Sequence, residues 1–292
     1  MNGEEVANRF RGKIVIVTGG GSGIGASLAK SFDQEGAVVA VCDIQKDNAD
    51  DVASNELRNP LRPTQGFHVD VTNDEQVRKM IQAVVKKYGR IDIYCSNAGI
   101  IQPYAEPNEG DSGITRYSEA KWKRLFEVNA LSHLIAIKEL LKIWNYRKPR
   151  SKPSFVMTAS AAGLLTQIGD ASYGVSKAAA VSFAEHLAIE HSDKLRVLCI
   201  CPQAVDTPFG EGMVQKTKNS AKTDGVISPT IVAACSLDAL SSQAESDAAL
   251  FIFPHPEVAT YAKRKGADHT RWLNGMIRFR KKQEKQLLNS RI

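Results

Sequence analysis

The stretch KIVIVTGGGSGIG, residues 13–25, joins a short apolar run to a cluster of glycines. The β-branched residues in its first half predict a buried strand, and the pattern that follows the glycines as far as Glu35 is typical of a helix. A strand, a glycine turn and a helix in this order let the backbone approach a pyrophosphate, because the helix begins with free N–H groups. The stretch therefore predicts the first unit of a dinucleotide-binding fold.

A second buried run, AVVAVC at 37–42, ends at Asp43. In such a unit a carboxylate at this place accepts hydrogen bonds from the adenosine ribose and repels a 2′-phosphate. The glycine turn contains no Lys or Arg that would attract that phosphate. We therefore expect NAD rather than NADP, with the alternative that Asp43 simply ends a strand.

The same alternation of buried runs and helical patterns continues along the chain. Strands are expected at 65–69, 91–95, 154–158, 195–201 and 248–253, and helices at 47–57, 73–88, 118–145, 170–191 and 228–240. Thr72 and Glu75 fit a capping box for the helix at 73–88. With no linker pattern, a chain of 292 residues predicts a single α/β domain at 1–256.

Residues 158–177, TASAAGLLTQIGDASYGVSK, bring together Ser160, Tyr173 and Lys177. Tyr173 and Lys177 are four residues apart, so a helix places the phenol and the ammonium on one face. A neighbouring cation favours phenolate, and we expect it to lower the pKa of Tyr173 toward the range of a general acid/base. An isolated Tyr and Lys at this spacing are more often an ordinary surface pair, so other motifs must decide between the two interpretations.

Two further polar residues have both a functional and a structural interpretation. Asp70 follows the third predicted strand and is placed to bond an adenine amino group while Val71 covers the ring, although a turn aspartate explains it equally well. Asn129 lies within an apolar helical pattern and must find partners there. It is either structural or part of a proton path.

Composition limits the partners that we expect. The net charge is +6, but residues 258–292 contain ten Lys and Arg against two acids, which leaves 28 basic and 30 acidic residues for the rest. A nearly neutral body argues against nucleic-acid binding. The five cysteines lack the spacing of metal sites, so we expect free thiols and no metal. No run of about 18 apolar residues occurs, and we expect a soluble, cytoplasmic protein without membrane association.

The C-terminal extension at 257–292 differs from the body because it is basic and amphipathic. Trp272, Met276 and Phe279 recur at helical spacing among Lys and Arg. This pattern permits binding to a membrane surface or an acidic partner. We favour packing of the apolar face on the body of the protein or on a sister subunit, which is the commoner use of such a stripe.

Several motifs in matching order resemble the short-chain dehydrogenase/reductase family over residues 10–253. They are the Thr18-Gly19-x-x-x-Gly23-x-Gly25 turn, the Asn97-Ala98-Gly99 element, and the ordered set Asn129, Ser160, Tyr173 and Lys177. The resemblance implies a Rossmann-type, doubly wound sheet of about seven parallel strands, and a homodimer or homotetramer with helices 118–145 and 170–191 at the interface. It also implies hydride transfer between a substrate carbon and nicotinamide.

The resemblance also assigns roles to single residues. Tyr173 would be the general acid/base, with Lys177 lowering its pKa and holding the nicotinamide ribose. Ser160 would orient the substrate, and Asn129 would support a water relay. The cofactor-binding set that it implies is Gly19, Ser22, Gly23, Ile24, Gly25, Asp43, Ile44, Asp70, Val71, Asn97, Ala98, Gly99, Tyr173, Lys177, Pro202, Val205 and Thr207.

Two departures from the family pattern occur. Pro202-Gln203 stands where relatives usually have Pro-Gly, and Pro254-His255-Pro256 replaces their usual ending. We expect an NAD-dependent dehydrogenase that interconverts a secondary alcohol, of apolar character, and a ketone. The alternatives are a carbonyl reductase using NADH or NADPH and a dinucleotide-binding regulatory protein. Substrate specificity is expected in the irregular segments 101–117, 161–171 and 203–226 and in the C-terminal extension.

Overall fold

The fold is known from a computed structural model. It describes residues 8–58, 66–101, 114, 117–147, 151–165, 170–210, 226–241 and 250–252. The predicted extension at 257–292, most of segment 101–117 and residues 211–225 lie outside the described residues.

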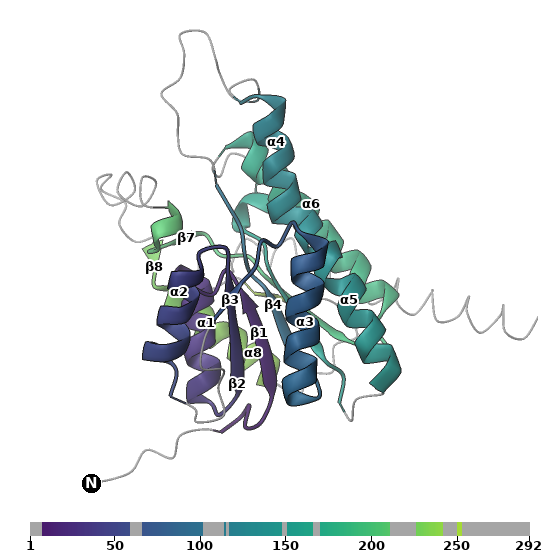
Figure 1. Cartoon of the computed structure of the whole chain (residues 1–292). Coiled ribbons are helices and arrows are strands. Elements are labelled where there is room, and N and C mark those ends of the chain that lie inside the picture. The colour runs from purple at the N-terminus through teal and green to yellow at the C-terminus, as the bar shows by residue number, and fades with distance from the viewer. Residues whose placement is uncertain are drawn as a thin grey trace, which may run out of the picture.

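Seven parallel strands form the central sheet in the order β3-β2-β1-β4-β5-β6-β9 (Figure 1). They are β1 (Ile14–Thr18), β2 (Val38–Asp43), β3 (Phe67–His68), β4 (Ile93–Ser96), β5 (Ser154–Thr158), β6 (Arg196–Ile200) and β9 (Leu250–Ile252). The direction of winding reverses between β1 and β4, and ligands of such sheets bind beyond the carboxyl ends of the strands at this point. The predicted doubly wound sheet is confirmed.

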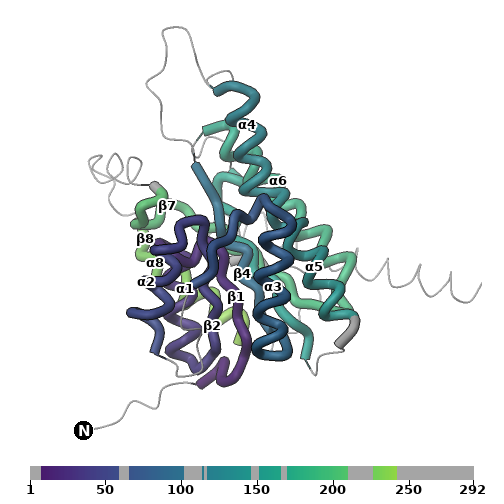
Figure 2. The backbone as a smooth tube through the Cα atoms, viewed as in Figure 1, coloured from purple at the N-terminus to yellow at the C-terminus, as the bar shows by residue number. Residues whose placement is uncertain are grey.

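Helices cover both faces of the sheet. They are α1 (Gly23–Gln34), α2 (Lys46–Asp51), α3 (Asp74–Tyr88), α4 (Glu119–Phe126), α5 (Ser132–Arg147), α6 (Ala171–Glu190) and α8 (Pro229–Ser241). Helices α3, α5 and α6 lie on one side of the sheet, and α1, α2 and α8 on the other (Figure 2).

Strand β1 illustrates why this sheet is buried on both faces. Ile14 and Ile16 belong to the apolar cluster that includes residues of α3, α5 and α6, whereas Val15 and Val17 belong to the cluster that includes residues of α1 and α8. Successive side chains of a strand point to opposite faces, so a strand covered on both sides is apolar throughout. This explains the continuous apolar runs in the sequence.

Three helix predictions need correction. The helix predicted at 47–57 is α-helical as far as Asp51 and continues as a π-helical turn, η1 (Val52–Glu56). The region predicted as one helix at 118–145 is interrupted between α4 and α5 by a π-helical turn, η3 (Glu127–Leu131). The predicted capping box at Thr72 and Glu75 is wrong, because α3 is capped by Asn73, whose side chain accepts from the Gln76 N–H. The Thr72 hydroxyl instead donates to Asp70 at 2.7 Å.

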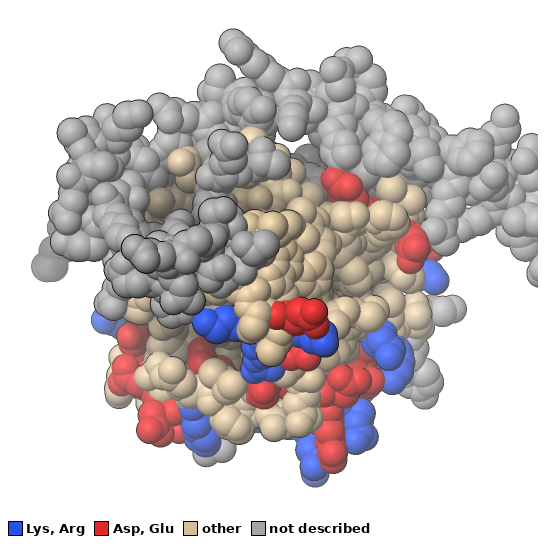
Figure 3. Space-filling model, turned by 90° about the horizontal axis from the view of Figure 1, so that it is seen from above, with Lys and Arg blue, Asp and Glu red and all other residues tan. Residues whose placement is uncertain are grey.

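The chain enters at the bottom of Figure 1, so the carboxyl ends of the strands point upward, toward the face seen in Figure 3. Acidic and basic side chains are interspersed along the part of this face that is coloured by type, and its middle is uncharged. None of the helices in the described part of the chain is both long and apolar enough to cross a membrane.

Candidate active site

The glycine turn between β1 and α1 has a backbone that only glycine tolerates. Gly19 and Gly23 have φ of 61° and 51°, in the left-handed region that side chains disfavour. A Cβ on Gly25 would lie 2.0 Å from the Gly19 carbonyl oxygen, so α1 begins in direct contact with the turn. Ser22, the N-cap of α1, is exposed. The turn therefore presents the N-terminus of α1 at the carboxyl edge of the sheet.

Asp43, the last residue of β2, contacts this turn directly. Its carboxylate accepts from the Gly21 N–H at 3.0 Å and from the Gln45 N–H at 2.9 Å. Ile44, which follows it, is 53% exposed. The carboxylate therefore lies beside the glycine turn, as a residue that reads the adenosine ribose requires.

Asn97 connects the ends of three neighbouring strands. Its amide donates to the Thr18 carbonyl at 3.0 Å and accepts from the Thr158 hydroxyl at 3.0 Å. The Thr18 hydroxyl in turn accepts from the N–H groups of Asn97 and Ala98. These bonds fix the segment after β4 against β1 and β5, below the predicted cofactor site.

The segment after β6 closes the other side of this site. A small two-stranded sheet pairs β7 (Ala204–Val205) with β8 (Val226–Ile227), and a 3₁₀ turn, η5 (Pro208–Gly210), follows β7. A Cβ on Gly23 would lie 3.1 Å from the Thr207 side chain, so Thr207 packs against the glycine turn. Pro202 accepts from the Ala161 N–H at 2.9 Å. The segment therefore spans from the glycine turn to the neighbourhood of Ser160.

These residues fit a nicotinamide dinucleotide. Side chains in place of Gly19 or Gly25 would collide with the Ala98 or Gly19 backbone, which leaves a bare backbone surface for phosphates. Asp43 would lie at the ribose, and Thr207 on the opposite side of the turn. Within the described residues, no group of three or more His, Cys, Asp or Glu is arranged to hold a metal.

Asp70 is engaged by protein partners. Its carboxylate accepts from the N–H and the hydroxyl of Thr72, at 2.9 and 2.7 Å, and lies 3.5 Å from the Arg124 guanidinium on α4. Desolvation acts to raise its pKa, but the Thr72 hydrogen bonds and the Arg124 charge outweigh it and hold the pKa below its usual range. The carboxylate is therefore a charged acceptor beside the half-buried Val71.

Tyr173 and Lys177 lie one turn apart on α6 and are both buried, at 8% and 3% exposure. The Lys177 ammonium donates to the Thr158 carbonyl at 2.8 Å and lies 5.8 Å from the centre of the Tyr173 ring. Ser160 precedes a 3₁₀ turn, η4 (Ala161–Gly163), and its hydroxyl accepts from the Ala162 N–H at 3.1 Å. The three predicted side chains therefore come together at the end of β5.

Burial governs the titration of this pair. Desolvation raises the pKa of Tyr173 to about 12, although a hydrogen bond with Ser160 opposes the increase. Desolvation lowers the pKa of Lys177 to about 8. The predicted lowering of the Tyr173 pKa is therefore wrong for this structure, because loss of hydration by the phenolate outweighs the hydrogen bond with Ser160.

Asn129 lies in the π-helical turn η3 and is fully buried. Its amide donates to the Ile100 carbonyl at 2.9 Å and to the Ser176 hydroxyl at 3.1 Å, and it accepts from the Ile100 N–H at 2.9 Å. A Cβ on Gly99 would lie 3.2 Å from Asn129 Oδ1 and 3.3 Å from Lys177 Nζ. Asn129 therefore belongs to the same group as Tyr173 and Lys177, and both of its amide N–H groups have protein partners.

Apolar side chains surround the Tyr173 ring. Leu125 and Ala162 form a small buried cluster with it, and Ile100 and Ile101 pack against this cluster. The Phe209 ring, 44% exposed, lies 6.2 Å from the Tyr173 ring. The surroundings of the phenol are therefore largely hydrocarbon.

Three polar residues of this region were missed by sequence reasoning. Thr158 ends β5 and bonds Asn97, and its position at a strand end was the available signal. Ser176 and His133 lie inside helical patterns, where nothing in the sequence separates them from ordinary helix residues.

Comparison with known proteins agrees with this geometry. A family model described as short chain dehydrogenase matches residues 13–218. The (+)-borneol dehydrogenase 1 of Salvia officinalis is 34% identical over 209 residues, which cover 71% of this chain and 75% of that protein. The meso-2,3-butanediol dehydrogenase of Serratia marcescens is 31% identical, with 72% and 78% covered.

Solved structures share the fold. A 3-ketoacyl-(acyl-carrier-protein) reductase from Brucella melitensis, complexed with NADH, superposes with a TM-score of 0.72 at 24% identity and covers 84% of this chain and 98% of its own. A short chain dehydrogenase/reductase from Burkholderia phymatum, in complex with NAD, gives 0.71 at 21% identity, with 87% and 93% covered.

Proposed function

The chain belongs to the short-chain dehydrogenase/reductase family of oxidoreductases, and we propose that it is an NAD-dependent enzyme that interconverts a secondary alcohol and a ketone. The observation that carries this proposal is the assembly of Ser160, Tyr173 and Lys177 at the end of β5, next to a backbone cradle for a dinucleotide. A protein that only binds a dinucleotide has no need of such a group.

In this proposal each residue has a distinct task. Tyr173 exchanges a proton with the substrate oxygen, and the Ser160 hydroxyl orients that oxygen. Lys177, which already donates to Thr158, uses its remaining N–H groups for the nicotinamide ribose. The nicotinamide supplies hydride chemistry when bound.

The remaining predicted cofactor contacts belong to the same proposal. Asp43 reads the ribose and disfavours a 2′-phosphate, so NAD is preferred to NADP. Asp70 and Val71 bind the adenine, and Val205 and Thr207 lie at the nicotinamide end. A cytoplasmic location, a homo-oligomer and a packed C-terminal extension complete the proposal, on the evidence of the sequence alone.

The substrate that we propose is apolar around its reacting carbon. Leu125, Ala162, Ile100 and Phe209 surround the phenol, and contact with hydrocarbon stabilises a bound ligand by about 25 cal/mol for each Å² removed from water. The borneol dehydrogenase among its relatives is consistent with such a substrate.

A second candidate is a carbonyl reductase on the same site. A phenol with a pKa of about 12 is protonated at neutral pH and is ready to donate to a ketone oxygen. Alcohol oxidation instead requires that the phenol first lose its proton. Rates measured with the oxidised and with the reduced cofactor decide between alcohol oxidation and ketone reduction.

The test is a panel of secondary alcohols and ketones assayed with NAD, NADP, NADH and NADPH by reduced-cofactor absorbance, for wild type and Tyr173→Phe. We expect turnover of an apolar member with NAD or NADH, and a loss of about 100-fold or more in Tyr173→Phe with NADH affinity unchanged. If Tyr173→Phe keeps the wild-type rate, the mechanism is wrong. If the protein binds NADH and turns over no substrate, the regulatory interpretation is favoured.

A further inference from the structure

His133 is a buried titratable side chain that the proposed chemistry does not use. It lies on α5, four residues after Asn129, and is 1% exposed. Its Nδ1 is 2.7 Å from the hydroxyl of Ser96, the last residue of β4, and its ring stacks on Phe183 of α6 at 6.4 Å. The imidazole therefore bridges a helix of the site and the end of a central strand.

The proton of this imidazole can be located. Burial, assisted by the charge of Lys177, lowers the pKa of His133 to about 3, so the ring is neutral and only one nitrogen carries hydrogen. Because Nε2 has no hydrogen-bond partner among the described residues, we assign the proton to Nδ1, which donates to the Ser96 hydroxyl.

This link complements the bonds of the Asn129 side chain. Asn129 holds Ile100 through two hydrogen bonds of 2.9 Å, whereas His133 holds Ser96. Both ends of the segment 96–100 are thus attached to one stretch of helix. Between them lies Gly99, where a Cβ would be 3.3 Å from Lys177 Nζ.

The π-helical turn η3 lies directly before the His133 attachment. Asn129 is within this turn, and His133 is the second residue of α5, which follows it. Turns of this kind often occur at functional sites. The bond between His133 and Ser96 therefore fixes the helix immediately after the turn.

We propose that His133 is a positioning residue: by joining the start of α5 to Ser96 it holds the π-turn and the segment 96–100 beside Lys177. The inference rests on the proposed function, because it assigns His133 a part in setting the geometry of that site. It excludes a role for His133 as a proton carrier.

The variants that test this separate the link from simple core packing. His133→Leu removes the link and keeps bulk, and His133→Asn can return an N–H near the position of Nδ1. Ser96→Ala removes the other partner. Ser236→Ala is the matched control, because it deletes a buried helix hydrogen bond of 2.7 Å to Val232, on α8 and outside the site.

The activity readout is the split between kcat and cofactor binding. We expect His133→Leu to lower kcat about tenfold, with the NADH dissociation constant within about twofold of wild type and the pH profile of kcat unchanged in shape. His133→Asn should recover most of the loss, and Ser96→Ala added to His133→Leu should cost little more. An unchanged kcat in His133→Leu, or a shifted pH profile, overturns the proposal.

A second readout does not depend on turnover. The Ile100 N–H donates to Asn129 Oδ1, so its hydrogen exchange reports the position of Asn129. We expect exchange at Ile100 to accelerate about tenfold or more in His133→Leu and in Ser96→Ala, but not in Ser236→Ala. If exchange at Ile100 is unchanged in both variants, the positioning role is overturned, even if the wild type turns over no substrate. If exchange accelerates in the variants but the wild type is inactive, the positioning role holds and only the proposed function is contradicted. If His133→Leu does not fold, Ser96→Ala decides by both readouts.

Discussion

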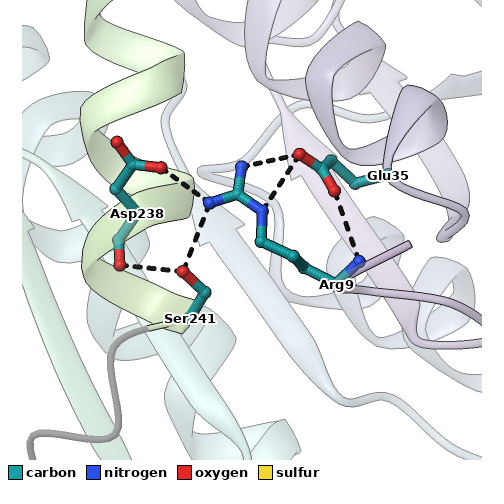
Figure 4. Close-up of polar contacts among 4 residues, drawn as sticks. All are labelled: Arg9, Glu35, Asp238 and Ser241. Atoms are coloured by element: carbon teal, nitrogen blue, oxygen red, sulfur yellow. Dashed lines mark hydrogen bonds and ion pairs between the residues drawn. The ribbon is translucent and has the colours of Figure 1, made fainter. Parts of the chain in front are cut away.

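Lys177 and Arg9 are two cations that lie near opposite ends of the strands of the central sheet, and their surroundings differ. Lys177, 3% exposed, lies at the carboxyl end of β5, and burial lowers its pKa to about 8. Arg9, whose side chain is 33% exposed, lies near the amino ends of the strands, between the ends of α1 and α8 (Figure 4). Hydrogen bonds with Glu35 and then Asp238 raise its pKa.

The two cations differ in how their charge is compensated. Among the described residues Lys177 forms no ion pair, so its ammonium loses hydration and gains a carbonyl and an aromatic ring. Arg9 meets two carboxylates while still in contact with water. We infer that the Lys177 charge lowers the stability of the fold and that the Arg9 charge raises it slightly.

The largest effect is expected where packing holds the site together. A Cβ on Gly163 would lie 2.6 Å from the main-chain carbonyl of Lys177, so Gly163→Ala must separate η4 from α6 and move Ser160 away from Tyr173. We predict a loss of about 100-fold in kcat/KM and of about 3 kcal/mol in unfolding free energy. Steady-state kinetics and urea unfolding measure the two.

Gly174→Ala is the matched control for this prediction. Its Cβ would lie 3.4 Å from the Ala162 carbonyl oxygen, an ordinary contact, in the same pair of elements. It should stay within about threefold of wild-type activity, since Ala favours the helix by up to about 1 kcal/mol. If the two variants have equal kcat/KM and equal unfolding free energy, the packing between η4 and α6 does not determine the geometry of the site.

Lys177→Met tests the sign of the buried charge. The folded-state pKa of about 8 lies below the ordinary 10.5, so between these values the unfolded chain binds more protons at this group and the Lys177 contribution to stability rises with pH, by about 3 kcal/mol in total. The variant lacks this rise, and we predict that it is inactive yet more stable than wild type at pH 7.

The measurement is urea unfolding from pH 7 to pH 10, compared between the variant and wild type at each pH. The comparison is needed because burial raises the pKa of Cys42 and Cys95, which lowers the stability of both proteins above about pH 9. Lys142→Met, which removes an ammonium that is 67% exposed and paired with Glu139, should leave the wild-type rise intact. A parallel pH dependence of wild type and Lys177→Met would contradict the assigned burial cost.

Asp43→Ser tests a charge that lies beside the proposed cofactor site rather than in the core. We predict that the ratio of NADPH to NADH dissociation constants falls about tenfold, corresponding to about 1.4 kcal/mol, because a carboxylate no longer repels the 2′-phosphate. Fluorescence titration with both cofactors measures it. Asp47→Ser, an exposed acid four residues away, is the control. If both variants shift the ratio equally, general charge rather than the position of Asp43 determines the preference.

The elements of this site that the sequence predicts are those encoded locally. The run at 13–25 specifies strand, glycine turn and helix within a few residues, and the spacing of Tyr173 and Lys177 places them on one face of α6. Their meeting with Ser160 follows from the parallel order of β5 and β6, which the alternation of strands and helices predicts.

What the sequence does not predict depends on contacts between distant segments. The π-turn at Glu127–Leu131 has no periodicity that distinguishes it from α-helix, and Asn129 and His133 find their partners only once β4 lies beside them. The pKa of Tyr173 rises rather than falls because neighbours from α4, η4, η5 and the segment after β4 exclude water from it. A spacing rule gives the distance to a charge but not the cost of removing solvent.

The smallest effect is expected at Arg9, near the amino ends of the strands. Arg9 donates to Glu35 at 2.6 and 3.0 Å and to Asp238 at 2.6 Å. Partly exposed pairs contribute little, so Arg9→Gln should lose about 1 kcal/mol of unfolding free energy at low salt, less at high salt, and no kcat. Urea unfolding at two salt concentrations measures this, with Arg9→Lys as the variant that keeps the charge and loses the planar fork. A salt-independent loss, or a fall in kcat while the protein remains folded, would mean that the two ends of the sheet are coupled and that the contrast between Arg9 and Lys177 is not one of local environment.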